Sequence, residues 1–387
     1  MSSKPSHGPQ GLQTYHAFQK REFLFGALLL FGSCFVGLLL LEIAVRIISP
    51  PSPFHPLIPL RPKMKMEIHI NLPGVSPVSI HSTNRWGLRG DEPPTDWGKH
   101  YTIVTIGGST THCFYLGDHK AWPYLLQEKL KKFDPSIWVG NGGIEGHSTR
   151  AHIIFMEKVI PKMKPKAVIF LPGGNDLGFS ISKEQFKKGN PQDLARGHSF
   201  YWPLFYSRLV QLLSLWKQIL IDRVEVVGQE QAKHNTFERI PLDHEFSLPD
   251  KNPKELLPAL GEYRENIKKL IALSRAQHIR PIFLTHPLLF DDTEEWKHVL
   301  GDYYWIKDPE HRISAATYWR LLNIYNQELL DVCREEKVDC FDLGRELPHS
   351  SELFYDSVHL NERGAEEVAN LVAMFLLSRG LPEKPTP

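Results

Sequence analysis

Along most of this chain, short apolar segments typical of buried strands alternate with segments whose apolar residues recur at helical spacing. Strands are expected near 101–107, 136–141, 167–172, 280–286 and 338–342. Helices are expected near 120–132, 149–162, 255–278, 314–336 and 361–379. Strands that alternate with helices predict an α/β domain in which helices wrap a parallel sheet.

The N-terminal region has a different pattern, an uncharged apolar run from Phe23 to Leu41. The run is long enough to cross a bilayer as a helix, and we interpret residues 23–45 as a transmembrane anchor. A cleaved signal peptide is the competing interpretation, but no small-x-small cleavage site follows the run. Lys20 and Arg21 precede it closely and only Arg46 follows within ten residues, so the positive-inside bias favours a cytoplasmic N-terminus and an extracytoplasmic C-terminal domain.

The composition of the next segments suggests a division of the chain. Prolines are dense after the apolar run, as in an extended linker between a membrane and a domain. The expected parts are a cytoplasmic tail (1–22), the anchor (23–45), a proline-rich stalk (46–77) and a catalytic domain (78–381) with insertions at about 177–252 and 287–313.

Each insertion allows two interpretations. The first carries apolar residues at helical spacing from Leu209 to Leu220 beside Arg208 and Lys217, which fits either a helix packed on the domain or a face that touches the bilayer or shelters an acyl chain. The second carries Trp296, Tyr303, Tyr304 and Trp305. It fits a lid or specificity loop as well as ordinary packing.

The first expected strand ends in two glycines and one hydroxyl. The segment reads Tyr-Thr-Ile-Val-Thr-Ile-Gly-Gly-Ser-Thr-Thr from Tyr101 to Thr111. Glycines at 107 and 108 allow a sharp turn, which delivers Ser109 to the carboxyl end of the strand. Ligands of open α/β sheets bind just outside that edge. A strand-to-helix turn with a capping serine is the alternative.

Three later segments place further polar groups in comparable positions. A glycine-rich loop with the sequence Asn-Gly-Gly-Ile-Glu-Gly-His follows the second strand. The third strand ends in Gly-Gly-Asn-Asp, which contains Asn175. Asp356 and His359 open the last expected helix as Asp-x-x-His. Three strand ends and an acid–base pair in this order favour one shared site.

In this order the segments resemble the four sequence blocks of the SGNH (GDSL-type) hydrolase superfamily, from Tyr101 to the C-terminus. The resemblance implies a flavodoxin-like three-layer α/β fold with a parallel sheet of about five strands. Ser109 matches the nucleophile, Gly146 the glycine and Asn175 the asparagine, while Asp356 and His359 match the final Asp-x-x-His. The first block departs from the family pattern, because it has Gly-Gly-Ser-Thr where Gly-Asp-Ser-Leu is usual.

These residue types fit acyl transfer. A neutral imidazole can take the proton of a serine hydroxyl near pH 7, and a carboxylate can fix its tautomer, which gives Ser109, His359 and Asp356 catalytic roles. The developing oxyanion needs preorganised donors. The candidates are the backbone N–H groups of Ser109 and Gly146 and the side-chain amide of Asn175. The Gly-x-Ser-x-Gly elbow of α/β-hydrolases is absent, because Thr occupies position 111.

Other residues of these segments have structural interpretations. Gly143 competes with Gly146 for the oxyanion role, and Asn175 could instead bond only loop backbone, as we expect of Asp176. We interpret His147 as a surface loop residue and His286 as a structural histidine at a strand end. Cys113 is interpreted as a small packing residue.

Charge and cysteine content exclude several classes of function. The net charge of +1 gives no basic field for nucleic acid. No phosphate-binding loop or dinucleotide fingerprint appears, so no cofactor is expected. Cys34 lies in the apolar run, and Cys113, Cys333 and Cys340 show neither disulfide nor zinc spacing, so no metal site is expected.

One further motif precedes the first strand, an Asn-x-x-Gly-x-Arg segment within His81–Asp91. It also resembles a segment of many membrane-anchored SGNH proteins. We expect it to cover a sheet edge.

Three functions remain open. The leading one is a membrane-anchored serine esterase or deacylase acting on an acyl ester, glycan or lipid, at the cell envelope. The second is an O-acyltransferase that passes the acyl group to an envelope polysaccharide, for which the resemblance implies an acyl-delivering membrane partner. The third is a catalytically silent envelope binding module, which the glycine at 108 and the insertions keep open.

Overall fold

The computed structural model describes residues 9–48, 60, 62–181, 207, 209, 225–227, 259–297, 299 and 314–381. The chain divides into two compact units. One unit comprises residues 1–53 and 200–222, and the other comprises residues 54–199 and 223–387.

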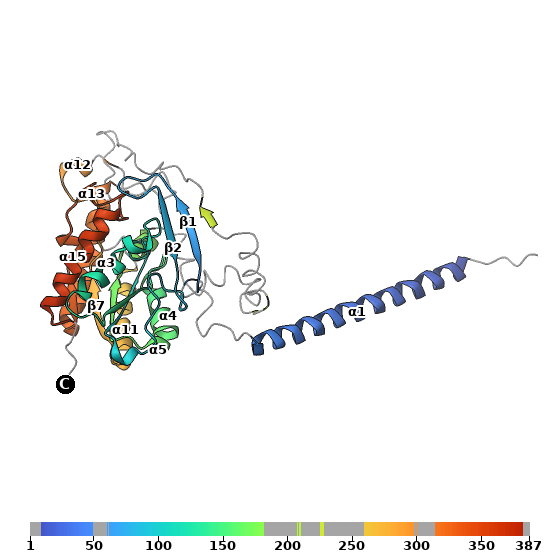
Figure 1. The fold of residues 1–387 in the computed structure, drawn as a ribbon. Coiled ribbons are helices and arrows are strands. Elements are labelled where there is room, and N and C mark those ends of the chain that lie inside the picture. The colour runs from blue at the N-terminus through green and yellow to red at the C-terminus, as the bar shows by residue number, and fades with distance from the viewer. Residues whose placement is uncertain are drawn as a thin grey trace, which may run out of the picture. The chain divides into compact units, whose positions relative to one another are not determined.

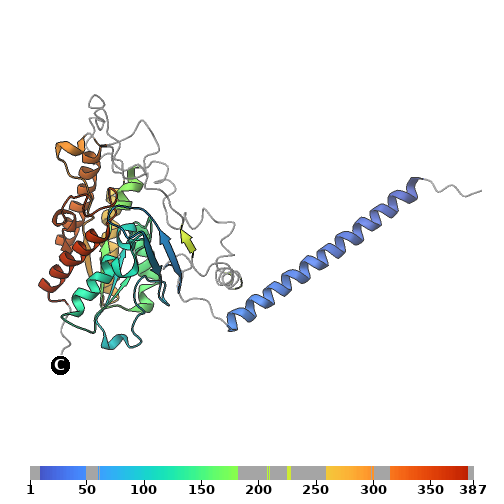
Figure 2. The same ribbon diagram turned by 45° about the horizontal axis from the view of Figure 1, so that its top comes forward.

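In the first unit, the described residues 9–48 form one long helix, α1 (Pro9–Ile48), drawn in blue in Figures 1 and 2. Its part from Arg21 to Ile48 is long and apolar enough to cross a membrane, a test that a signal sequence near the N-terminus also passes. Glu42 pairs with Arg46 one turn later at 2.7 Å. The same carboxylate accepts hydrogen bonds from Ser207 Oγ at 2.8 Å and from the Leu209 N–H at 2.9 Å.

The second unit is built on a five-stranded sheet in the order β4-β3-β5-β7-β8, and every neighbouring pair in it is parallel. The strands are β3 (Thr102–Gly107), β4 (Trp138–Asn141), β5 (Ala167–Leu171), β7 (Arg280–Leu284) and β8 (Asp339–Phe341). In chain order this is 2-1-3-4-5, the flavodoxin-like arrangement. The predicted fold class is therefore confirmed, and each of the five strands lies where the apolar runs predicted it.

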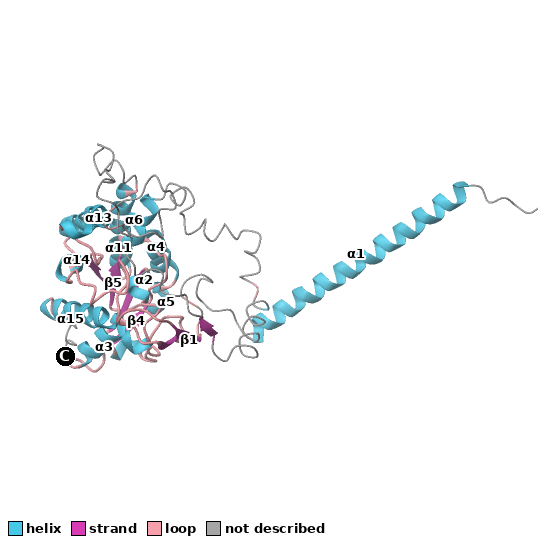
Figure 3. Ribbon diagram, turned by 90° about the horizontal axis from the view of Figure 1, so that it is seen from above, coloured by secondary structure: helices cyan, strands magenta, loops and turns pink. Residues whose placement is uncertain are grey.

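Helices cover both faces of this sheet. Figure 3 shows α3 and α15 on one side of the strands and α4, α11 and α13 on the other. The longer helices are α3 (Trp122–Lys131), α4 (Thr149–Lys158), α11 (Leu260–Ala276), α13 (Ala315–Glu336) and α15 (Glu362–Ser378). The shorter ones are α2 (Ser109–His112), α5 (Ile160–Met163), α6 (Gly174–Ile181), α12 (Glu294–Lys297), α14 (Leu343–Glu346) and the 3-10 turns Trp97–Lys99 and Asp118–Lys120.

The helix expected over 149–162 is split into α4 and α5. The break falls at Val159, directly before a second helix that has a proline in its first turn. Proline has no N–H to donate to the preceding turn, so the chain ends one helix and begins another.

The core lies between the two helix layers and the sheet. Strands β3 and β5 are buried at every position, as their continuous apolar, β-branched sequence requires of strands covered on both faces. The rings of Phe170 and Phe283 stack across β5 and β7 with centroids 4.9 Å apart. This packing fixes the carboxyl ends of the strands, where the predicted site residues lie.

A second, three-stranded sheet has the order β2-β1-β6, with β1 (Lys65–His69), β2 (Val78–Ser82) and β6 (Glu225–Val227). Figures 1 and 2 both show β6 beside the blue strands. The predicted stalk of residues 46–77 is therefore wrong at its C-terminal end. Met66, Ile68 and Ile70 are buried at every second position, an alternation typical of a half-buried strand that the proline content obscured.

The Asn-x-x-Gly-x-Arg segment covers a sheet edge, as predicted. Arg89 forms an antiparallel bridge with Asn141 at the end of edge strand β4. The Arg89 N–H donates to the Asn141 carbonyl at 2.9 Å, and the Asn141 N–H donates back at 3.1 Å. Edge N–H and C=O groups are paired at this point instead of being left for another chain.

The structure contradicts the expectation that no cysteines pair. Cys333 in α13 and Cys340 in β8 form a disulfide, with Cα atoms 6.1 Å apart. Lys337 ends α13 in a left-handed conformation, with φ of 54°, and turns the chain back toward its own helix. A helix end and a strand seven residues later come together in this way, which spacing alone does not reveal.

Most of the two predicted insertions lies outside the described residues. This applies to the predicted helix from Leu209 to Leu220, apart from Leu209 itself, and to Tyr303, Tyr304 and Trp305. Trp296 is described, and its ring packs against Phe290 with centroids 4.8 Å apart.

Candidate active site

Ser109 begins α2 directly after strand β3. Gly107 allows no side chain there, because a Cβ would lie 2.1 Å from Thr111 Oγ1. Cys113 then ends the helix in a left-handed conformation, with φ of 54°. The strand, the two glycines and this very short helix place the serine hydroxyl at the carboxyl edge of the sheet, as the sequence predicted.

The structure brings Ser109 together with His359 and Asp356, which are about 250 residues away in the chain. His359 Nε2 lies 2.8 Å from Ser109 Oγ, and His359 Nδ1 lies 2.6 Å from Asp356 Oδ2. This continuous chain of hydrogen bonds has the geometry of a nucleophile, a base and an orienting carboxylate.

Asp356 is held in place and kept charged by its surroundings. Its Oδ1 accepts hydrogen bonds from the backbone N–H groups of Val358 at 2.9 Å and His359 at 2.7 Å. Burial raises the pKa of this carboxyl, but the charge of His359 and these hydrogen bonds outweigh it and hold the pKa below its ordinary value. The group is therefore a carboxylate near pH 7, and it favours the imidazole tautomer that has its proton on Nδ1.

An aromatic ring supports the histidine from the side. Tyr355 stacks on His359 with centroids 5.5 Å apart and an angle of 10° between the rings. Tyr115 in turn packs edge-on against Tyr355 at 5.9 Å. The stack fixes the plane of the imidazole, and sequence reasoning missed it because Tyr115 and Tyr355 belong to distant segments.

The glycine-rich loop after β4 forms a tight turn beside the serine. The His147 N–H donates to the Ile144 carbonyl at 3.2 Å, and Gly146 at the third position has φ of 71°. A β-turn with a positive φ at this position strongly favours glycine. The Ile144 N–H donates to the Gly107 carbonyl at 3.1 Å, which ties the turn to the end of β3.

The geometry distinguishes the two glycines that competed for the oxyanion role. The Gly143 N–H donates to Asn141 Oδ1 at 2.9 Å, and a Cβ on Gly143 would lie 2.4 Å from the backbone nitrogen of His112. Gly143 is thus committed to packing against α2. Gly146 has open space around its Cβ position, and no residue that the structure describes accepts a hydrogen bond from its N–H.

Asn175 lies in the first turn of α6, close to the residue that precedes the serine. Its Nδ2 donates to the His147 carbonyl at 2.9 Å, which leaves the second hydrogen of the amide available. A Cβ on Gly108 would lie 2.3 Å from this Nδ2. The glycine at 108 therefore gives Asn175 room beside the nucleophile, and an aspartate there would require the asparagine to move.

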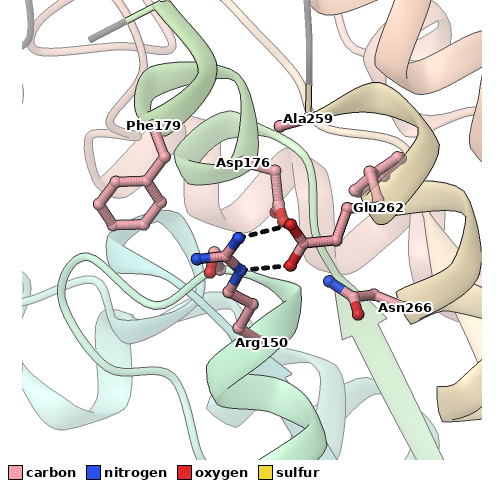
Figure 4. A pocket seen from close by; sticks show the side chains of 8 residues that line it. Arg150, Asp176, Phe179, Ala259, Glu262 and Asn266 are labelled. Carbon is pink, nitrogen blue, oxygen red and sulfur yellow. Dashed lines mark hydrogen bonds and ion pairs between the residues drawn. The ribbon is translucent and has the colours of Figure 1, made fainter. Parts of the chain in front are cut away.

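Asp176 ties two of the site loops together. It accepts hydrogen bonds from the Thr149 N–H at 3.1 Å, from Thr149 Oγ1 at 2.5 Å and from the Gly173 N–H at 3.2 Å. These contacts confirm the predicted loop-bonding role. Figure 4 shows Asp176 on the wall of a small pocket beside the ion pair of Arg150 and Glu262.

Three other predicted residues have the following places. His286 is buried, and its ring nitrogens contact Thr110 Oγ1 at 3.2 Å and the Pro287 carbonyl at 2.9 Å, as expected of a structural histidine. Cys113 is buried, and burial raises its pKa to about 11, in keeping with a packing residue. His147 is half-buried in its loop and so only partly the surface residue we expected: its Nδ1 is buried, and burial lowers its pKa to about 4.

Comparisons with known proteins point to one family. The sequence profile of the GDSL-like lipase/acylhydrolase family matches residues 105–367. Among solved structures, the chain is similar to LAE5, an α/β hydrolase enzyme from the metagenome of Lake Arreo, Spain, with 17% identity, coverage of 73% of this chain and 97% of that one, and a TM-score of 0.41. It is also similar to Axe2, an acetylxylan esterase from Geobacillus stearothermophilus, with 17% identity, coverage of 72% and 95%, and a TM-score of 0.41. No curated protein sequence matches the chain.

Proposed function

Because this chain belongs to the GDSL-like lipase/acylhydrolase family, we propose that it is a membrane-anchored serine esterase that removes an acyl group at the cell envelope through an acyl-serine intermediate. The family identifies the chain as a hydrolase that acts on ester bonds. The mechanism, the residues and the location are the proposal.

The observation that carries the mechanism is the chain of hydrogen bonds from Ser109 through His359 to Asp356. Ser109 Oγ attacks the carbonyl carbon of the ester while its proton passes to His359 Nε2. The Asp356 carboxylate stabilises the imidazolium that results. When the ester C–O bond breaks, the alcohol leaves with that proton, and the acyl group stays on Ser109.

The negative charge of the tetrahedral intermediate requires donors that are already in place. We assign this role to the N–H groups of Ser109 and Gly146 and to the side-chain amide of Asn175. The open space at Gly146 and the position of Asn175 against Gly108 support the assignment. A water molecule then gives a proton to His359 Nε2 and attacks the acyl carbonyl. The bond between the acyl carbon and Ser109 Oγ breaks, His359 returns the proton to Oγ, and the acid is released.

The fate of the acyl group is tested by identifying the products. Full-length protein in detergent, supplied with p-nitrophenyl acetate and an oligosaccharide, should release acetate and leave the mass of the oligosaccharide unchanged, because water is the proposed acceptor. Mass spectrometry of the products checks this. An acetylated oligosaccharide that forms with the wild type and not with Ser109→Ala would contradict hydrolysis and support O-acyl transfer.

The proposed location places the catalytic unit outside the cytoplasm, with residues 1–22 inside and α1 crossing the bilayer. Two basic residues, Lys20 and Arg21, precede the apolar run and one, Arg46, follows it. This difference in positive charge supports the orientation. The disulfide between Cys333 and Cys340 also supports it, because structural disulfides persist mainly in oxidising compartments. Envelope glycans and lipids are the acyl esters within reach of an enzyme in that position.

Reporter fusions test the orientation. Alkaline phosphatase, which is active only outside the cytoplasm, should be active when it is fused after Pro387, and a reporter that is active only inside should be silent there. The matched control fuses the same reporters after residue 22, where we expect the opposite pattern. A cytoplasmic C-terminus would rule out an envelope substrate.

A further inference from the structure

The Asn-x-x-Gly-x-Arg segment forms a closed turn that directs its arginine into the protein. Asn84 Oδ1 accepts hydrogen bonds from the N–H groups of Trp86 at 2.9 Å and Leu88 at 3.2 Å. Gly87 has φ of 72°, a left-handed conformation that glycine adopts without strain. The asparagine and the glycine of the motif therefore shape the turn, and the arginine is what the turn presents.

Arg89 is only 1% exposed and is almost fully engaged. Its Nε donates to Asp118 Oδ1 at 3.0 Å, so its charge is paired inside the protein. Its Nη1 donates to the His112 carbonyl at 2.6 Å and to the Cys113 carbonyl, and its Nη2 donates to the Leu116 carbonyl. All three carbonyls belong to the end of α2 and the loop that follows it, directly behind Ser109.

Two of these carbonyls have one other donor each: the Leu116 N–H donates to the Cys113 carbonyl at 3.0 Å, and Asn141 Nδ2 donates to the His112 carbonyl at 3.4 Å. The left-handed Cys113 ends α2 after a single turn, so carbonyl groups at the helix end have no partners within a longer helix. Buried carbonyls without donors are costly. One planar guanidinium supplies donors in several directions at once, which an ammonium group cannot do with the same fixed geometry.

A side-chain contact joins the same end of α2 to the turn of residues 144–147, which contains Gly146 and is called the oxyanion turn below. His112 is buried, and its Nδ1 lies 3.0 Å from Glu145 Oε1. Glu145 directly precedes Gly146 in the turn, and its side chain is 54% exposed. His112, whose carbonyl accepts a hydrogen bond from Arg89, thus connects the helix that begins at Ser109 to the turn that contains Gly146.

We propose that Arg89 is a positioning residue of the active site. It holds the end of α2, and the contact between His112 and Glu145 then sets the oxyanion turn relative to Ser109. Arg89 lies outside the region of 105–367 that matches the family. The inference rests on the proposed serine esterase mechanism.

Arg89→Lys in full-length protein in detergent tests the proposal. Lysine keeps the positive charge opposite Asp118 but lacks the planar guanidinium that donates to several carbonyls at once. A fluorophosphonate probe gives two quantities: the fraction of molecules labelled at completion and the rate constant of labelling per labelled site. Misplacement of reacting groups by about 1 Å costs on the order of 10²-fold in rate. We expect the rate constant per site to fall by about ten- to a hundredfold with little change in the fraction labelled. A purely structural role would lower the fraction labelled and leave the rate constant unchanged.

Two further variants keep the test decisive if Arg89→Lys folds poorly. Glu145→Ala removes a half-exposed side chain and its contact with His112, so it should fold and lower the rate constant per site severalfold, whereas Glu145→Gln keeps an acceptor for Nδ1 and should stay near the wild type. The control is Arg280→Lys, because Arg280 pairs with Asp339 at 2.7 Å at the opposite, amino end of the strands. Its rate constant should match the wild type.

Rate constants per site equal to the wild type in both Arg89→Lys and Glu145→Ala would overturn the positioning role. That result would leave the esterase mechanism intact as long as Ser109→Ala is not labelled. Labelling of Ser109→Ala at the wild-type rate would instead overturn the mechanism on which the inference rests.

Discussion

Replacing Ser109 by alanine should lower kcat/KM for p-nitrophenyl acetate by a factor on the order of 10⁴ to 10⁶, because the attacking oxygen is lost while the oxyanion donors remain. The measurement is release of p-nitrophenol by full-length protein in detergent. Removing the hydroxyl breaks one hydrogen bond, to His359 Nε2, and creates no buried cavity larger than one oxygen atom. The thermal unfolding temperature should therefore change little.

A serine elsewhere in the domain serves as the control for this substitution. Ser378 is exposed in the last turn of α15, at the opposite end of that helix from His359, and its Oγ donates to the Phe375 carbonyl at 2.7 Å. Ser378→Ala should retain wild-type activity. Activity of Ser109→Ala within tenfold of the wild type would contradict the assignment of the nucleophile.

The second large effect is expected from Asp356→Asn, which should lower kcat by about 10⁴-fold while the protein stays folded. The two oxygens of Asp356 have different partners: Oδ1 accepts from the N–H groups of Val358 and His359, and Oδ2 faces His359 Nδ1. An asparagine would place its oxygen toward the two N–H donors and its NH₂ toward Nδ1. Nδ1 would then have to accept, so the ring proton would move to Nε2, and His359 could no longer take the proton of Ser109.

Comparison with Asp356→Ala separates this tautomer effect from the loss of a charge. Alanine removes the carboxylate and leaves the imidazole free to adopt either tautomer, so Asp356→Asn should be at least as inactive as Asp356→Ala. Steady-state hydrolysis of p-nitrophenyl acetate at pH 7 gives both values. An Asp356→Asn variant with more than a tenth of the wild-type kcat would rule out the orienting role.

The sequence predicted the sheet, its helices and the segments that meet at the site, because each depends on a local pattern. The β-branched runs that became β3 and β5 end in glycines, and parallel strands bring such ends to one edge. Because Ser109, Gly146 and Asn175 each follow such a strand, the sequence alone predicted that they lie close together. Their catalytic roles stay predictions, although the structure brings the groups into hydrogen-bonding or packing distance.

The features that the sequence did not reveal depend on contacts between distant segments. Arg89 contacts carbonyls more than twenty residues away, and His112 contacts Glu145 across a strand and a helix. The pairing of Cys333 with Cys340 depends on the left-handed residue Lys337, for which the sequence gives no signal. Each required the folded arrangement, because neither periodicity nor spacing marks it.

The most direct test of the central claim is to locate the covalent adduct that a fluorophosphonate probe forms. Peptide mass spectrometry of labelled full-length protein should find one modified residue, Ser109, and labelling should be lost in Ser109→Ala and strongly slowed in His359→Ala. Labelling of the wild type would also exclude a catalytically silent binding module. An unlabelled wild-type protein, or an adduct on any other residue, would contradict the account.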